Sequence, residues 1–252
     1  NDNSVIPILY YDPITKEIVY STKPTSSLPN GVNYGDYIFW NSVSNSWVVG
    51  SNNINIGSNA GQINQGGNSV ALGNQSGNLN QGASSIAIGD NSGYTQQGDA
   101  SIALGKTAGK YSQGNNSIAI GLLAGSNTQQ SYAIAIGFQA GYNSAYAAYA
   151  VQIGSDAGSN STAAGHAIQI GHSAGANSTI ADYATQIGYK TGYGSTIASN
   201  AVQVGYNAGY NSTIASNGIF GLFIDDSYNF VESKYRVAAN EIIQEEEVDE
   251  EV

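Results

Sequence analysis

Tyrosines recur at fixed places in this sequence, and they are the residues best suited to binding. Six of them directly follow one of two glycines that recur along the chain: Tyr94, Tyr142, Tyr189, Tyr193, Tyr206 and Tyr210. A tyrosine has an apolar ring and a polar tip, so a row of them on a surface could stack on sugars or on another protein. The alternative is that these rings only pack over the turns of the chain.

Few other residues could carry out catalysis or hold a metal. His166 and His172 lie six residues apart with Asp156 nearby, and Asp182 completes the one set to test. Histidines and a carboxylate can bind zinc, but neither histidine recurs in other copies of the repeat described below. No serine stands in a hydrolase elbow between a strand and a helix, and the glycines form no phosphate loop. We therefore predict a protein with no enzymatic activity, cofactor or metal.

The residues that position these side chains form ten copies of one short repeat. A plain copy is segment 85–89, Ser-Ile-Ala-Ile-Gly. The closing glycine recurs every sixteen residues from Gly57 to Gly137 and every seventeen up to Gly205, and a second glycine follows four residues after each. The alternation of isoleucine with alanine predicts a short strand. A period of this length suits one coil of a β-solenoid with two strands and two turns.

Stacked coils must share a core, because one coil cannot bury its apolar residues alone. Strand spacing places coils about 4.8 Å apart, so ten coils would form a rod of roughly 45–50 Å. The two isoleucines of each copy either fill the interior of the coil or face an axis between chains.

Two rows of glutamine also follow the period. The central strand residue is alanine in the sixteen-residue copies and glutamine in the others, at Gln152, Gln169, Gln186 and Gln203, which predicts a change of cross-section near residues 142–151. This row is either buried with every amide paired or opens to solvent or to a partner chain. A second row, Gln65, Gln81, Gln97 and Gln113, forms either an amide ladder or a polar row facing solvent.

The flanking segments divide the chain into four parts. Residues 1–50 contain two predicted β-hairpins that either cap the array or dock it onto a larger particle, and residues 51–217 are the repeat array. Residues 218–244 begin with the apolar run 219–224, which is expected to cap the last coil. Residues 245–252 are an acidic tail, either solvated or in contact with a basic partner.

The composition limits the possible partners. The net charge is −11, but the array holds only four acids and three lysines and has no basic patch, so nucleic-acid binding is not expected. There is no cysteine and no apolar run long enough to cross a bilayer, so membrane insertion is not expected. The chain starts at Asn1 without any methionine, which suggests a processed chain or a fragment.

The repeat resembles the head repeats of the trimeric autotransporter adhesins, whose motif reads approximately Asn-Ser-Val-Ala-Ile-Gly. The copies most like it are 68–73, Asn-Ser-Val-Ala-Leu-Gly, and 116–121, Asn-Ser-Ile-Ala-Ile-Gly. The array also looks like repeat fibre proteins of large DNA viruses and phages, as does the lead-in with Tyr-Tyr-Asp at 10–12 and Lys-Glu-Ile-Val-Tyr at 16–20. The adhesin resemblance implies a left-handed parallel β-roll in which three chains pack side by side.

These observations lead to one main expectation and two alternatives. We expect an all-β, non-enzymatic fibre or spike protein that forms a homotrimer on a virion surface. Its partners would be further copies of itself, a larger particle or capsid held by a terminal segment, and a host glycan or receptor. The first alternative is a bacterial trimeric adhesin head at the cell surface. The second is an ice-binding solenoid, which would need regular threonine rows where the sequence has scattered threonines.

Overall fold

The computed structural model describes residues 28–50, 52–145, 147–162, 165–179, 182–196 and 200–213, and the backbone alone of strands at 8–11, 18–21, 219–224 and 230–235. All regular structure in these residues is β, with no helix. The chain divides into two units, Asn1–Ser51 and Asn52–Val252.

The first unit contains the two predicted hairpins. Strands β1 (Ile8–Tyr11) and β2 (Ile18–Ser21) pair antiparallel, as do β3 (Tyr37–Asn41) and β4 (Ser46–Gly50). The second hairpin places Trp40 opposite Trp47, with an edge-to-face contact of 5.5 Å between ring centroids. Both hairpins are confirmed, whereas their role as a cap or a docking module stays a prediction.

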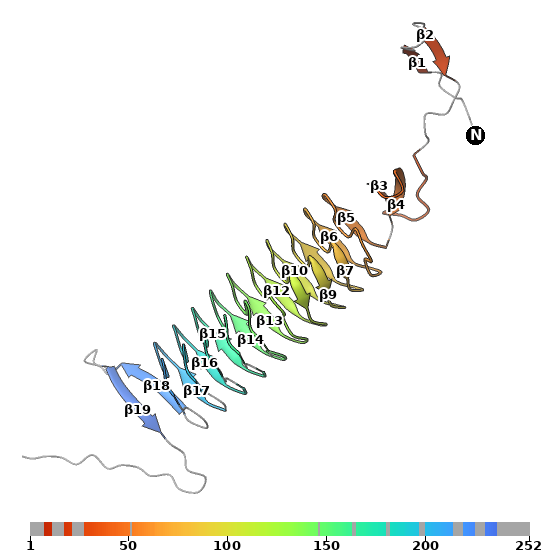
Figure 1. Ribbon diagram of the computed structural model, residues 1–252. Coiled ribbons are helices and arrows are strands. Elements are labelled where there is room, and N and C mark those ends of the chain that lie inside the picture. Colours follow the sequence, from red (N-terminus) through yellow and green to blue (C-terminus); the bar gives the residue numbers. More distant parts are fainter. Residues whose placement is uncertain are drawn as a thin grey trace, which may run out of the picture. The chain divides into compact units, whose positions relative to one another are not determined.

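The second unit is the predicted parallel β-solenoid (Figure 1). One three-residue strand from every copy joins a continuous parallel sheet in the order of the sequence. The strands are β5 (Ile54–Ile56), β6 (Val70–Leu72), β8 (Ile86–Ile88), β10 (Ile102–Leu104), β12 (Ile118–Ile120), β13 (Ile134–Ile136), β14 (Val151–Ile153), β15 (Ile168–Ile170), β16 (Thr185–Ile187) and β17 (Val202–Val204). Equivalent residues pair directly across every step, so the register never slips.

The second arm of each coil returns the chain to the next copy. In the sixteen-residue coils it carries β7 (Leu79–Gln81), β9 (Thr95–Gln97) and β11 (Tyr111–Gln113), which form a smaller parallel sheet. The described part of the seventeen-residue coils has no strand in this arm. The left hand of the roll stays a prediction from the family resemblance.

The inward row of the main sheet is alanine, not isoleucine. Ala87 and Ala119 are completely buried, while the isoleucines on either side of them are only half-buried. The prediction that the two isoleucines fill the interior of the coil is therefore wrong, and the alternative, that they face an axis between chains, stays a prediction. Small side chains lie inside because the two arms of a coil are close together.

A glutamine from the return arm fills the space beside each alanine in the sixteen-residue coils. Gln81, Gln97 and Gln113 are each 2% exposed, so the prediction of a solvent-facing row is wrong for them. The Nε2 group of each donates to a main-chain carbonyl of the facing strand at 2.8–2.9 Å. Gln65 donates to Gln81 along the row at 3.1 Å. The amides thus tie the two arms together more than they form a ladder.

In the seventeen-residue coils the interior glutamine comes from the strand instead. Gln152, Gln169, Gln186 and Gln203 are at most 2% exposed, so the prediction that this face opens is wrong. Each of the first three Nε2 groups donates to the Oε1 atom of the next glutamine at 2.9 Å. Small serines such as Ser178 replace glutamine on the return arm, so the coil keeps one buried amide.

Left-handed backbone conformations at the corners explain the asparagine-rich composition. A typical coil has three non-glycine residues with positive φ, such as Asn59, Asn64 and Asn68 at 53–59°. Asparagine tolerates this conformation better than other side chains do. The second glycine of a coil is required by space as well, because a Cβ on Gly93 (φ 51°) would lie 2.6 Å from the amide oxygen of Gln97.

The change of cross-section falls where the sequence predicts it. The left-handed corner in the return arm lies seven residues after the closing glycine at Thr128, but six residues after it at Asn143. Starting with the coil that contains β13, the return arm therefore follows a different path from that in the earlier coils.

The last coil is followed by a strand pair. Strand β18 (Ile219–Ile224) pairs parallel with β17 and antiparallel with β19 (Phe230–Tyr235). The predicted capping strand is thus present, while the acidic tail at 245–252 lies outside the described residues.

Candidate interaction surfaces

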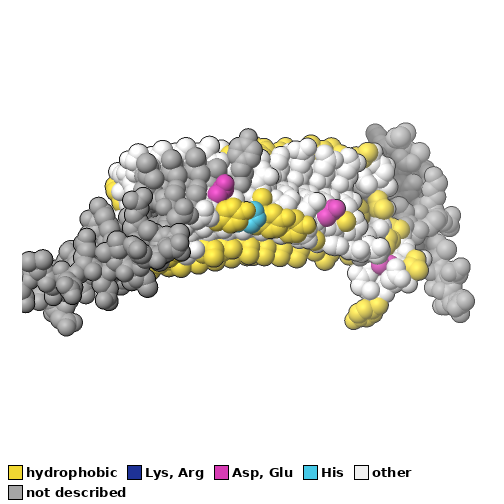
Figure 2. Space-filling view, turned by 90° about the horizontal axis from the view of Figure 1, so that it is seen from below, with side chains coloured by type: hydrophobic (Ala, Val, Ile, Leu, Met, Phe, Trp, Pro, Cys, Tyr) yellow, Lys and Arg dark blue, Asp and Glu magenta, His cyan; other side chains and the backbone are white. Residues whose placement is uncertain are grey.

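The outer side of the main sheet is an apolar face. The first and third residues of its strands point away from the alanine and glutamine row, and all of them except Thr185 are isoleucine, valine or leucine. Ile56, Leu104 and Val204 are among those classed as exposed. Figure 2 shows a yellow band that runs along the array. A contiguous apolar surface of this length is typical of a protein–protein contact.

Four of the six predicted tyrosines form two stacked pairs. The Tyr189 and Tyr206 rings lie 5.0 Å apart and 8° from parallel, and His172 extends this stack at 5.2 Å. The Tyr193 and Tyr210 rings lie 5.3 Å apart. Stacking follows from the solenoid, because equivalent positions in successive coils are one strand spacing apart.

A lysine lies between these two stacks. The Nζ atom of Lys190 is 5.4 Å from the ring centre of Tyr189 and 5.9 Å from that of Tyr193. These are cation–π distances. The corner thus combines two aromatic pairs with one positive charge.

The other two predicted tyrosines lie apart from these stacks. Tyr94 meets Tyr111 edge-to-face at 6.4 Å, and Lys110 lies over the Tyr111 ring at 4.8 Å. Tyr142 has no ring neighbour among the described residues. The six tyrosines are therefore not one continuous ladder.

The largest aromatic stack was missed by the sequence analysis. Tyr132, Tyr149, His166 and Tyr183, which we call the aromatic column, stack with centroids 4.6–5.0 Å apart and planes within 8° of parallel. In Figure 2 it is the yellow row with one cyan histidine. Their exact seventeen-residue spacing in the sequence was the signal that could have found them.

Stacking limits what these rings can bind. Each inner ring of a stack has both faces covered by its neighbours, and only edges and hydroxyl groups point outward. A sugar that stacks on an aromatic ring needs an open face. The predicted stacking of sugars is thus restricted to unstacked rings such as Tyr142 and to the ends of the stacks.

Both histidines take part in these stacks. Among the described residues, no three His, Asp or Glu side chains lie close enough together to hold a metal ion. The ring of His166 lies between Tyr149 and Tyr183, and Nδ1 of His172 lies 3.1 Å from Ser173 Oγ.

Threonines form a row that the sequence analysis described as scattered. Thr162, Thr179, Thr196 and Thr213 are seventeen residues apart and all exposed. The main-chain N–H of each of the first three donates to a carbonyl in the next coil at 3.0 Å. The description of scattered threonines is therefore wrong for this part of the array.

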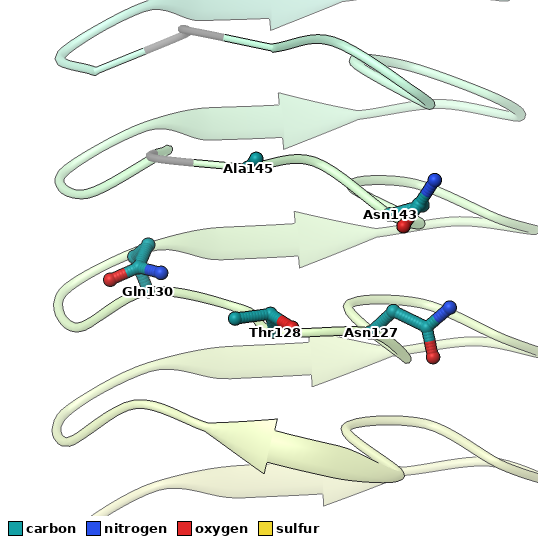
Figure 3. Close-up of a pocket in the computed structure, with 5 residues that line it drawn as sticks. All are labelled: Asn127, Thr128, Gln130, Asn143 and Ala145. Carbon is teal, nitrogen blue, oxygen red and sulfur yellow. The ribbon is translucent and has the colours of Figure 1, made fainter.

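A shallow hollow marks the change from sixteen to seventeen residues (Figure 3). It has a volume of about 200 Å³ and is lined by Asn127, Thr128, Gln130, Asn143 and Ala145. The strand pairing of the sixteen-residue return arms ends here with the single bridge between Tyr111 and Asn127. The hollow thus arises from the divergence of two return arms, and its small size and polar lining suit water.

Comparisons with known proteins give no relative. No family model matches this chain, and neither does any curated protein or solved structure. No helix in the described residues is long and apolar enough to span a membrane.

Proposed function

We propose that this chain is a non-enzymatic structural fibre or spike protein that assembles as a homotrimer on a virion surface. The observation that carries the proposal is the apolar face of the main sheet. Its side chains lie outside the coil and stay half-buried or exposed in the described array. Apolar area of this kind is stabilised when a partner removes it from water.

A further copy of the chain is the partner that best fits this face. The face is only two side chains wide, and it repeats at the strand spacing over the whole sheet. A second copy offers the same period over the same length. The number three comes from the resemblance to adhesin heads, and the virion from the resemblance of the lead-in and array to viral fibre proteins.

The terminal hairpins and the host-facing surface complete the proposal. One terminal segment would mount the fibre on a larger particle, and unstacked tyrosines such as Tyr142 would contact a host glycan or receptor. Attachment of this type needs no catalytic group.

The test is the native mass measured by light scattering on a sizing column. Three copies of the 26.1 kDa chain weigh 78.3 kDa. The double variant Ile118→Lys/Ile134→Lys places charges on the apolar face and should give a monomer. The matched control is Leu122→Lys, which changes an exposed leucine outside the strands and should leave the mass unchanged. A monomeric parent protein would refute the proposal.

Two alternatives keep specific support. A bacterial trimeric adhesin head shares the same repeat resemblance and the same predicted trimer, and differs in being exposed at a cell surface. An ice-binding solenoid is favoured by the exposed threonine row at residues 162–213. Thermal hysteresis that disappears in a Thr179→Val/Thr196→Val variant would transfer the proposal to ice binding.

A further inference from the structure

The apolar face alone does not determine the axial register between two packed copies of the array. Successive strands carry nearly the same apolar residues at nearly the same spacing. Two such faces would match almost as well after a slip of one coil, because the contacts repeat. Repetitive flat strands specify their register weakly. An assembly of these arrays therefore needs a feature that does not repeat.

The aromatic column occurs in only four consecutive coils. Its corner position holds Asn68, Ser84, Ala100 and Asn116 in earlier coils and Asn200 in the next. All of these residues, like the column itself, have a positive φ of 51–61°. The corner thus forms without an aromatic ring.

Aromatic residues at this corner do little to stabilise the single chain. A positive φ is unfavourable for bulky side chains, and strained positions that persist often have a function. Tyr132, Tyr149 and Tyr183 are also 51%, 53% and 60% exposed, so they gain little from burial in the single chain.

The column is continuous with the apolar face. Each of its residues lies two positions before the first residue of a strand, as Tyr149 does before Val151. The residue between them is buried, as is Ala150, so both neighbours point outward. Because the ring faces are covered, the column is a ridge of ring edges and hydroxyl groups. Such a ridge fits against a solid partner surface better than against a stacking ligand.

We propose that the aromatic column packs against a second copy of this chain and fixes the axial register of the assembly. This inference rests on the proposed homo-oligomer. A second copy is the chosen occupant because the column borders the face that copies would share, and because tyrosine is favoured in the cores of protein interfaces. Only one alignment places the ridges of all copies at the same height.

The test replaces the column with the residue found at the same corner elsewhere. The variant Tyr132→Asn/Tyr149→Asn/His166→Asn/Tyr183→Asn should fold, with unfolding of the dilute monomer unchanged or shifted to higher temperature. Its dissociation constant, from light scattering over a dilution series, should rise at least about tenfold. The control Tyr189→Asn/Tyr206→Asn removes a stack at another corner and should assemble like the parent.

Register is measured by disulfide cross-linking between single introduced cysteines. Each is the only cysteine in its variant, because the parent chain has none. In the parent background, Ile168→Cys should cross-link with Ile168→Cys but not with Ile134→Cys, two coils away. In the column variant, the mixed cross-link should appear.

Three results would overturn the inference. Unchanged affinity and register in the column variant would refute it alone and leave the homo-oligomer standing. A parent chain that stays monomeric would refute both. Assembly that survives while binding to a glycan array is lost would identify a sugar as the occupant of the ridge.

Discussion

The buried glutamine row predicts how the stability of the array should depend on pH when one of its amides is replaced by a carboxyl group. Gln169 is completely buried, its Oε1 accepts from Gln152 Nε2, and its own Nε2 donates to Gln186 Oε1, both at 2.9 Å. The substitution Gln169→Glu keeps the size and shape of the side chain. It replaces the donor with an oxygen that, when ionised, faces the acceptor of Gln186.

The magnitude follows from the pKa of the introduced carboxyl. Burial without a positive partner can raise the pKa of a glutamate to about 8–9, against about 4.3 in the unfolded chain. Below pH 4.3 the carboxyl is protonated in both states, donates to Gln186, and costs little. As the pH rises, ionisation favours the unfolded state by about 1.36 kcal/mol per pH unit. At pH 7 the variant should be less stable by about 3–4 kcal/mol.

The assay is urea unfolding followed by circular dichroism at several pH values. Gln96→Glu is the matched control, because it adds the same charge at an exposed side chain. The difference in unfolding free energy between the two variants should be near zero at pH 4 and grow toward pH 7. Equal stability of both variants at pH 7 would show that the amide row is not buried, and would refute our description of the interior.

Two further predictions test the packing of the interior. Gly175→Ala should destabilise the array by at least about 1 kcal/mol in thermal unfolding. Gly175 has a φ of 65°, and a Cβ there would overlap the Gln169 amide. The control Gly67→Ala should be nearly neutral in the same experiment, because a Cβ at that position has open space. Ala119→Leu should lower the free energy of unfolding by about 1–3 kcal/mol through overpacking, because Ala119 is fully buried among Ala103 and Ala135. The control Ile120→Leu, on the outer face, should change the melting temperature little. An Ala119→Leu variant as stable as the parent would contradict the tight packing of the interior.

Most of the fold could be predicted from the repeat, because its period restricts the structures that one copy can form. A period of sixteen residues with paired glycines leaves room for little except one β-coil, and the strands, the change near residue 142 and the capping strand all lie where the sequence indicates. The inward side of the strand was harder to predict. Isoleucine is the more apolar residue, so alternation alone suggested that it could be inside, yet the narrow coil admits only alanine or one extended glutamine.

The surfaces were predicted less completely than the fold. The stacks of Tyr189 with Tyr206 and of Tyr193 with Tyr210 involve residues that had been singled out because they follow glycines. None of the tyrosines in the aromatic column follows a glycine, and its fourth member is a histidine, so selecting tyrosines beside glycines does not find it. Comparing each position with the one seventeen residues later would have identified both this column and the threonine row.

The hydrogen bonds between coils also determine how the array responds to tension. Bonds such as that from Ile86 N to Ser101 O, 2.9 Å, join one coil to the next, and the first and last strands of the sheet lie at opposite ends of the stack (Figure 1). A pull on these two ends loads the outermost coil first, and its bonds open before those behind it. A released coil of sixteen residues can extend to about 55 Å in place of the roughly 4.8 Å it occupied in the stack. Each released coil therefore lengthens more than tenfold, so under tension the array extends in coil-sized steps while the remaining coils stay intact.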